Sequence, residues 1–539
     1  MLSDYLGRKM RFTFAGICLL AIDGSLAIAS QGASSQTTVS RQRSEATAHH
    51  QKGLSLYRAK DPEGAMHELQ LSVQIDPGFV EAWNDLGVIQ RKEERLSQAV
   101  ASFEKAVSLN PGYTSAIYNL ALAYEAQNQT DPAIRQASRL VELSPDMAQA
   151  HYLYGRLLVK QNHLERANEQ LRKALALDTT LLKAHLELGT VLRRQGFTDD
   201  AIKELKNCLT KDPKLVEAHF QLGLALVQQG SQEEARETFA KAVELKPEFT
   251  EARVNLGQLL EAAGRVEEAK EQYRQALKLS PGNEGIQLRL AQILIDGEAL
   301  GQAREILEKA LAEHRSSADL HFENGRLNAR LGALEKARSE LQTAITLRPN
   351  APHFYMELSR VLQQLGRPAE EKVALEKVIS LDANSAEAHY ALAQLAKKRG
   401  DSDASKSELE QTERIRNAQT QRDLALGFVR SGVVLAQKGD FDGAVTDFRK
   451  ALKITPELGE AHFNLAGALL QKGESQAALE SFKAALKLAP HWPEAHYQLG
   501  RTLVLVNRKS EAIAEFRLAL EQDPHHAAAK QAMKELAEK

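Results

Sequence analysis

The sequence is poor in the residues from which several classes of protein are built. Among 539 residues there are two cysteines, Cys18 and Cys208, which cannot form a disulfide framework and lack the paired spacing of a zinc site. The 69 basic and 71 acidic residues give a formal net charge of −2. This balance argues against a nucleic-acid partner, because such proteins carry an excess of basic residues that neutralises phosphates. Proline is also scarce, with 15 residues, but its positions are not random.

The N-terminus has the order of a secretory signal peptide. Basic residues within positions 8–11 precede an apolar stretch over 12–22, and a small-x-small pattern ends at Ala29. The stretch is well short of the roughly 20 residues that span a bilayer. The sequence therefore predicts a signal peptide over 1–29, export to the periplasm or the extracellular space, and no stable membrane insertion after cleavage.

Two features near this segment extend the prediction. Translation could begin at Met1 or at Met10, and the sequence does not distinguish them. Residues 30–45 are rich in Ser, Gln and Thr, a composition typical of a flexible leader.

Ten of the prolines follow a 34-residue period, which indicates an array of stacked repeats. If this proline is position 32 of each repeat, fourteen repeats run from Ala46 to His526. Eleven occupy 46–419, an insertion fills 420–424, and three occupy 425–526. The prolines are Pro77, Pro111, Pro145, Pro213, Pro247, Pro281, Pro349, Pro456, Pro490 and Pro524.

Other positions keep the same period and predict two helices in each repeat. Position 8 is always Gly, Ala or Ser, and position 20 is Ala except at Glu371 and Ser405. Small residues at both positions allow the two helix backbones to approach closely. Position 15 is Gly or Asn in most repeats, as expected where a helix ends in a left-handed residue. Each repeat is therefore predicted to be helix, turn, helix, turn.

These positions resemble the tetratricopeptide repeat (TPR) family. Repeat two carries most of the family pattern in Trp83, Leu86, Gly87, Ala99, Phe103, Ala106 and Pro111. The resemblance covers 46–526 and implies an all-α fold, a right-handed α-solenoid in which the first helix of each repeat lines a concave surface. Residues 527–539 are expected to form a polar capping helix.

The match weakens around the insertion. Residues 401–426 contain neither Gly nor Pro, and repeat eleven departs from the pattern at Ser405, Thr412 and Asn417. We expect either one elongated helix or a kinked joint between the long and the short part of the array.

Helical periodicity separates a packing stripe from an opposite face on each first helix. Positions 4, 7, 8 and 11 share one side, and positions 2, 5, 9, 12 and 13 share the other. Aromatic and arginine side chains, which dominate binding hot spots, recur at positions 5 and 9. They are predicted either to bind a partner or, for the aromatic residues, to pack against the neighbouring repeat. The candidates are Tyr118, Tyr152, Arg156, Phe220, Phe322, Arg326, Arg360, Tyr390, Phe463, Tyr497 and Arg501.

Eight histidines occupy position 4, on the packing stripe. Neighbouring repeats are about 8–10 Å apart, too far for ligands that each lie about 2 Å from one ion. We therefore expect packing histidines and no metal. They are His49, His151, His185, His219, His321, His389, His462 and His496.

The sequence contains no motif of catalysis or phosphate binding, such as GxSxG, HExxH or GxxxxGK[ST]. It therefore predicts a non-catalytic interaction scaffold without a cofactor, holding a polypeptide segment in its groove. The alternative is an accessory subunit of an envelope assembly, secretion or polysaccharide-processing complex whose chemistry resides in a partner. The sequence identifies neither the partner nor the oligomeric state.

Overall fold

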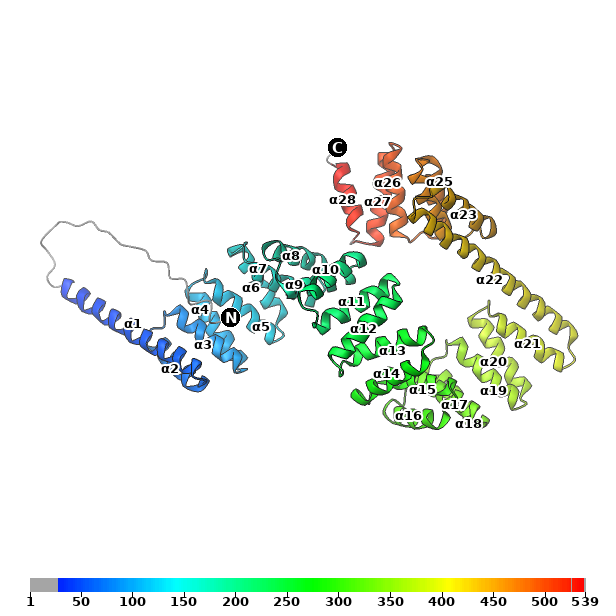
Figure 1. Ribbon diagram of the computed structural model, residues 1–539, viewed down its shortest axis with the longest axis horizontal. Helices are drawn as coiled ribbons and strands as arrows, with labels where there is room; N and C mark the ends of the chain where they lie inside the picture. Colours follow the sequence, from blue (N-terminus) through cyan, green and yellow to red (C-terminus); the bar gives the residue numbers. More distant parts are fainter. Residues whose placement is uncertain (1–27, 525, 538–539) are drawn as a thin grey trace. The chain divides into compact units, whose positions relative to one another are not determined.

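The computed structural model describes residues 28–524 and 526–537, which form 28 α-helices and no strand. These helices divide into two compact bodies, up to Ser280 and from Pro281 onward. The N-terminal body contains α1 (Ile28–Arg58), α2 (Pro62–Ile75), α3 (Val80–Lys92), α4 (Leu96–Leu109), α5 (Thr114–Ala126), α6 (Thr130–Leu143), α7 (Ala148–Lys160), α8 (Leu164–Leu177), α9 (Leu182–Arg194), α10 (Thr198–Lys211), α11 (Val216–Gln229), α12 (Gln232–Leu245), α13 (Thr250–Ala262) and α14 (Val266–Leu279) (Figure 1).

The C-terminal body continues the same alternation of short helices, with one exception near its middle. Its helices are α15 (Glu284–Asp296), α16 (Leu300–Glu313), α17 (Ala318–Arg330), α18 (Leu334–Leu347), α19 (Pro352–Gln364), α20 (Pro368–Leu381), α21 (Ala386–Lys398), α22 (Ser402–Gln437), α23 (Phe441–Ile454), α24 (Gly459–Gln471), α25 (Ser475–Leu488), α26 (Pro493–Leu505), α27 (Lys509–Gln522) and α28 (Ala527–Ala537). Each predicted repeat corresponds to two consecutive helical segments, and the fold is an α-solenoid.

The two helices of a repeat meet through the small residues that the sequence singled out. A Cβ atom added at Gly223, position 8 of repeat six, would lie 2.6 Å from Cε1 of Phe239 on α12. In the same repeat Ala235, at position 20, is completely buried. Hydrogen alone fits at Gly223 because a large side chain of the second helix fills the space.

The turn between the two helices uses a left-handed residue in all fourteen repeats. Glycine or asparagine occupies most of these positions, and positive φ persists where Lys60, Glu94 and Glu298 replace them. The prediction from position 15 is therefore confirmed and applies also to repeats without its preferred residues. The left-handed residues are Lys60, Glu94, Asn128, Asn162, Gly196, Gly230, Gly264, Glu298, Gly332, Gly366, Gly400, Gly439, Gly473 and Asn507.

The segment preceding the first repeat is helical in the structure. Residues 30–45, expected to form a flexible leader, belong to α1, which has neither Gly nor Pro between positions 33 and 52 to interrupt it. Arg43 of this helix contacts the array through the Phe79 ring, 4.0 Å from its guanidinium, and the carbonyl of the buried Ala46 accepts a hydrogen bond of 2.7 Å from Ser72 Oγ. Of the predicted signal peptide over 1–29, residues 1–27 lie outside the described residues.

Helix α22 joins repeats eleven and twelve. Its 36 residues include the second helix of repeat eleven, the insertion over 420–424 and the first helix of repeat twelve. Of the two alternatives that the sequence left open, the structure has the single elongated helix (Figure 1). From residue 413 to 424 every residue except the half-buried Ile415 is exposed, whereas Ala425 and Val429 enter the core of the last three repeats.

The last helix covers the open end of the array. On α28, Ala532, Met533 and Leu536 pack against the hydrophobic core of the last repeats. This placement matches the capping helix expected over 527–539, of which 538–539 are not described. None of the helices in the described ranges combines the length and hydrophobicity required to cross a membrane.

Candidate functional site

The candidate site is the surface formed by positions 2, 5, 9, 12 and 13 of the first helices, here called the first-helix face. Its three phenylalanine rings pack against other aromatic rings of the array. The ring centroid of Phe322 lies 4.8 Å from that of Phe354, and the Phe463 ring stacks on Trp492 at 4.5 Å. In the N-terminal body the Phe220 ring lies 4.7 Å from Phe249. Of these contacts only that between Phe322 and Phe354 joins one repeat to the next, because Phe249 and Trp492 end the repeats that contain Phe220 and Phe463.

The rings of three tyrosines on this face each contact an arginine guanidinium. The guanidinium of Arg156 lies 5.6 Å from the ring centroid of Tyr152, and burial raises the pKa of that phenol. Burial likewise raises the pKa of Tyr118, one repeat earlier. Tyr390 is more accessible, with 43% of its surface exposed, and Arg416 of α22 lies over its ring at 5.5 Å.

Tyr497 and Arg501 of α26 form the last such pair. The Arg501 guanidinium lies 5.8 Å from the Tyr497 ring, and its Nη1 donates to Gln498 at 3.3 Å. The other side of the Tyr497 ring is near His526, with the ring centroids 4.9 Å apart. Arg501 is exposed and has no ion pair recorded among the described residues.

The arginine at position 9 of repeat nine links two repeats. Arg326 on α17 donates from Nη2 to Asp296 of α15 at 2.6 Å and from Nη1 to Glu323 at 2.8 Å. Only 2% of Glu323 is exposed, and this burial raises the pKa of its carboxyl. Arg326 therefore contributes to the stacking of repeats eight and nine, and its loss would leave a buried carboxylate without its cation.

Arg156 and Arg360 form similar bridges. Arg156 forms an ion pair with Glu125 of the preceding repeat. Glu125 also binds Lys160, at 2.6 Å. Arg360 on α19 binds Glu357 at 2.7 Å and pairs with Glu387 of the following repeat. These arginines are thus already neutralised by carboxylates of their own chain.

Several residues of the site were missed by the sequence analysis. Glu323 and Glu187 occupy position 6, at the border between the face and the packing stripe, and burial raises the pKa of both. An arginine three residues after a glutamate on one helix was an available signal, because such residues are neighbours on a helix surface. Glu371 had been noted only as a departure from Ala at position 20.

The position-4 histidines connect three structural segments. In repeat fourteen, His496 Nδ1 lies 2.6 Å from Glu515 Oε2 on α27, and Nε2 lies 3.0 Å from the carbonyl oxygen of Pro490 in the preceding turn. Trp83 uses its indole Nε1 for the same contact, donating to the Pro77 carbonyl at 3.0 Å. The predicted packing role is therefore confirmed, and its cause is a hydrogen bond that several side chains can make. The other residues at position 4 with this contact are His151, His185, His219, Arg253, Gln287, His321, Tyr355, His389 and His462.

The described residues contain no group of three or more His, Cys, Asp or Glu side chains placed to hold a metal ion. Cys208 is buried on α10, and burial raises the pKa of its thiol to about 11. A thiol with such a pKa is protonated at neutral pH and is a weak nucleophile.

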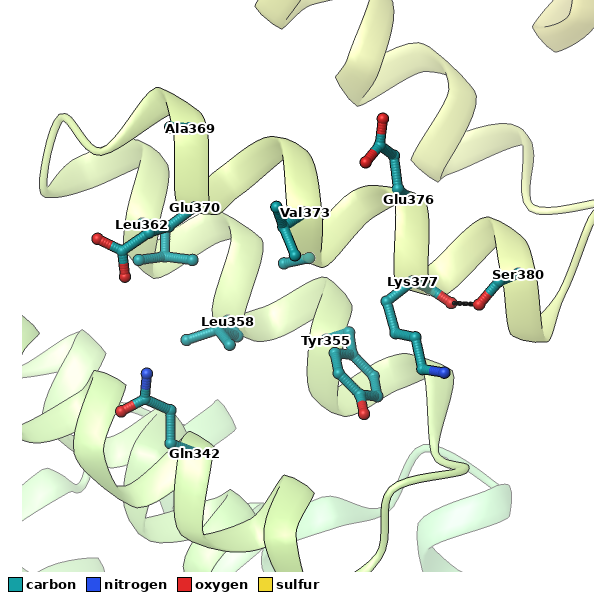
Figure 2. Close-up of a pocket in the computed structure, with 11 residues that line it drawn as sticks. Gln342, Tyr355, Leu358, Leu362, Ala369, Glu370, Val373, Glu376, Lys377 and Ser380 are labelled. Carbon is teal, nitrogen blue, oxygen red and sulfur yellow. Dashed lines mark hydrogen bonds between the residues drawn. The ribbon is translucent and has the colours of Figure 1, made fainter.

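Repeat ten is bordered by two pockets on different sides. The first, of about 760 Å³, lies among α18, α19 and α20 and is lined mainly by apolar side chains. Figure 2 shows Leu358, Leu362 and Val373 along it, with Glu370 at one end and Lys377 at the other. Val373 is 66% exposed. None of the predicted partner-binding residues lies here.

The second pocket, of about 350 Å³, opens on the first-helix face and includes Arg360 and Tyr390. It is formed by α19, α20 and α21, and we call it the repeat-ten pocket. The structure thus brings two of the predicted residues together with a carboxylate that the sequence analysis did not assign to the site. Its lining is Met356, Ser359, Arg360, Gln363, Glu371, Glu387, Tyr390, Ala391, Gln394 and Lys398.

Comparison with known proteins identifies the repeat. Three family profiles, each described as a tetratricopeptide repeat, match the chain, and together they cover more than half of it. One matches residues 90–157, 227–275, 260–331 and 469–536, the second 186–248 and 430–493, and the third 148–180 and 352–385. No curated protein matches the chain.

Several solved structures are similar to parts of the chain. A tetratricopeptide repeat protein from Parabacteroides merdae is 18% identical, covering 47% of this chain and 99% of its own, with a TM-score of 0.38. PilF from Pseudomonas aeruginosa is 22% identical, covering 40% and 97%, with a TM-score of 0.35. YrrB, a TPR protein with an unusual peptide-binding site, is 20% identical, covering 34% and 95%, with a TM-score of 0.32.

The repeats identified by the family profiles characterise a protein-interaction scaffold. They account for the 34-residue period, the small residues at the contact of the two helices and the left-handed turn. The chain belongs to the tetratricopeptide repeat family.

Proposed function

We propose that the chain is a non-catalytic scaffold that holds a polypeptide segment on its first-helix face. The observation that carries this proposal is the repeat-ten pocket, which opens on that face beside the exposed ring of Tyr390. An aromatic ring and hydrogen-bonding side chains around one opening suit a peptide, which presents both backbone amides and side chains.

The ion pairs of the arginines on this face favour a peptide as the ligand and disfavour a polyanion. Because Arg156, Arg326 and Arg360 bind carboxylates of the chain, a bulk anion would have to displace those ion pairs. A peptide can instead use the rings, amides and pockets between them. The other candidate residues of the face are proposed to contribute through the surface that packing leaves accessible.

A random peptide display library selected on the whole chain tests this proposal. We expect enrichment of peptides whose affinity, measured by fluorescence anisotropy, falls about tenfold with Tyr390→Ala, since an aromatic hot-spot contact contributes about 1.4 kcal/mol or more. Val373→Ala, in the apolar pocket of Figure 2, is the control and should leave affinity unchanged. Failure to enrich any peptide, or sensitivity to Val373→Ala alone, contradicts the proposal.

We also propose that the chain is exported and that a signal peptide is cleaved after Ala29. The support is the order of basic, apolar and small residues in the N-terminal sequence. Intact mass and N-terminal sequencing of the protein from its native cell test it. A mature N-terminus at position 30 agrees with the proposal, and an intact N-terminal segment contradicts it.

A further inference from the structure

Repeat ten has a buried carboxylate at the position where the other repeats have a small residue. Glu371 on α20 occupies position 20 and is 4% exposed. Its one recorded side-chain hydrogen bond among the described residues comes from Gln363 Nε2 to Oε1, at 3.3 Å. Burial raises the pKa of this carboxyl. A charge with so few partners lowers the stability of the repeat.

The carboxylate lies in the wall of the repeat-ten pocket. Three lining residues, Met356, Ser359 and Glu371, are at most 7% exposed, whereas Tyr390 and Lys398 at the pocket's outer part are exposed. The pocket therefore has a buried end, to which Glu371 contributes the charge, and an open end on the first-helix face. Its volume of about 350 Å³ accommodates one long side chain.

The charges around the pocket select the ligand. Arg360 is already bound to Glu357 and Glu387, so it does not neutralise Glu371. The positive charge of Lys398 lowers the pKa of Glu371, but the Lys398 ammonium is exposed and remains hydrated. A cation brought to the buried end gains more from Glu371 than an anion gains from the hydrated Lys398, because electrostatic attraction is stronger away from water.

We propose that the repeat-ten pocket accepts a lysine or arginine side chain of the bound polypeptide, whose cation pairs with Glu371. The aliphatic stem of such a side chain fits beside Met356 and Ala391, while Tyr390 at the opening contacts the adjoining peptide. This inference rests on the proposed function and specifies the residue that anchors the peptide.

Three variants separate binding from folding. Glu371→Ala restores the residue that most repeats have at this position, and Glu371→Gln removes the charge while keeping the shape. Glu370→Ala is the matched control, because it deletes a neighbouring carboxylate that is exposed and binds Arg367 and Arg338 outside the pocket. Glu371→Ala is expected to fold at least as stably as the original chain, so a loss of binding cannot be attributed to unfolding.

The experiment measures the affinity of display-selected peptides for the whole chain and these variants. We expect the peptides to share one lysine or arginine whose replacement by norleucine weakens binding about tenfold. Glu371→Ala and Glu371→Gln should cause the same loss and remove the effect of the norleucine replacement, whereas Glu370→Ala should change nothing.

The outcomes distinguish the two proposals. Peptides that depend on Tyr390 but bind Glu371→Ala and the original chain equally overturn this inference and leave the proposed function standing. Peptides that share an acidic residue in place of a basic one also overturn it. If the original chain selects no peptide, the proposed function fails and this inference fails with it.

Discussion

At the residue scale, position 4 shows how one hydrogen bond can be made by several residue types. Histidine, tryptophan, arginine, glutamine and tyrosine differ in size and charge, yet each donates to a carbonyl of the preceding turn, as His496 and Trp83 do. Eleven of the fourteen repeats have a donor of sufficient reach at this position, whereas Ile117 and Phe428 occupy it without one. The histidine ladder therefore belongs to the packing of the repeats.

Substitutions at His496 test this requirement. His496→Leu removes both hydrogen bonds and leaves Glu515 without its partner, so the free energy of unfolding should fall by about 1–2 kcal/mol. His496→Gln should cost less, because Gln287 at position 4 of repeat eight already donates to the Pro281 carbonyl at 2.8 Å. Urea denaturation followed by circular dichroism measures both. If both variants lose the same free energy of unfolding, the hydrogen bond to the carbonyl of the preceding turn does not contribute to stability.

The buried carboxyl of Glu371 predicts a specific dependence of stability on pH. Burial raises its pKa in the folded chain above the usual 4.5, so between these two values the folded chain binds more protons than the unfolded chain. Stability from this group is therefore lost as pH rises through that window. Lys398 and Gln363 oppose the shift without cancelling it.

Thermal denaturation of Glu371→Ala and the original chain measures this effect. The gain in Tm from Glu371→Ala should be small near about pH 4 and larger near about pH 7, since only the ionised carboxyl is penalised by burial. Glu370→Ala serves as the control, with no gain that grows with pH. If the difference in Tm between Glu371→Ala and the original chain is the same at every pH in this range, burial of the ionised carboxyl is not its cause.

At the element scale, α22 is a helix whose middle has no core beneath it. The exposed residues over 413–424 separate buried side chains such as Thr412 from Ala425. The segment has no proline or glycine and is rich in helix-forming residues, so local propensity supports the helix there. Continuity through this stretch joins repeat eleven to repeat twelve without a turn.

A proline in this segment should break the connection and leave the repeats intact. Gln419→Pro removes a helical hydrogen bond and should open the helix locally, so trypsin should cleave at Arg416 or Arg422 far faster than in the original chain. Gln419→Ala is the control and should stay resistant. The Tm should change little, because no core residue moves. A large fall in Tm would mean that the cores depend on helix continuity.

The helices could be predicted from the sequence, whereas most contacts between them could not. The 34-residue period predicted the helix pairs, because proline, glycine and alanine each satisfy a structural requirement within one repeat. Proline marks the end of the second helix, glycine allows the left-handed turn, and alanine allows the two helices to approach closely. The partners of Arg326 could not be found in this way, because Asp296 lies in the preceding repeat and reaches it only through the stacking of α15 and α17. Glu371 broke the pattern visibly, but the pocket beside it requires three helices in place.

At the scale of the whole molecule, each body is an array in which repeats contact their neighbours, and α28 covers the last one. Such arrays present side chains of successive repeats along one face, which suits a ligand that is itself a chain. The proposed binding surface and the stacking surface share residues here, because Arg156, Arg326 and Arg360 link neighbouring repeats.

Site-specific photo-cross-linking tests most directly the claim that a polypeptide occupies the first-helix face. p-Benzoyl-phenylalanine is placed at Tyr390, on that face, or at Val373, in the apolar pocket of Figure 2; both positions are exposed. Each chain is irradiated with a display-selected peptide, and the product is identified by mass spectrometry. The account predicts a cross-link from position 390 and none from position 373; cross-linking from position 373 alone would contradict it.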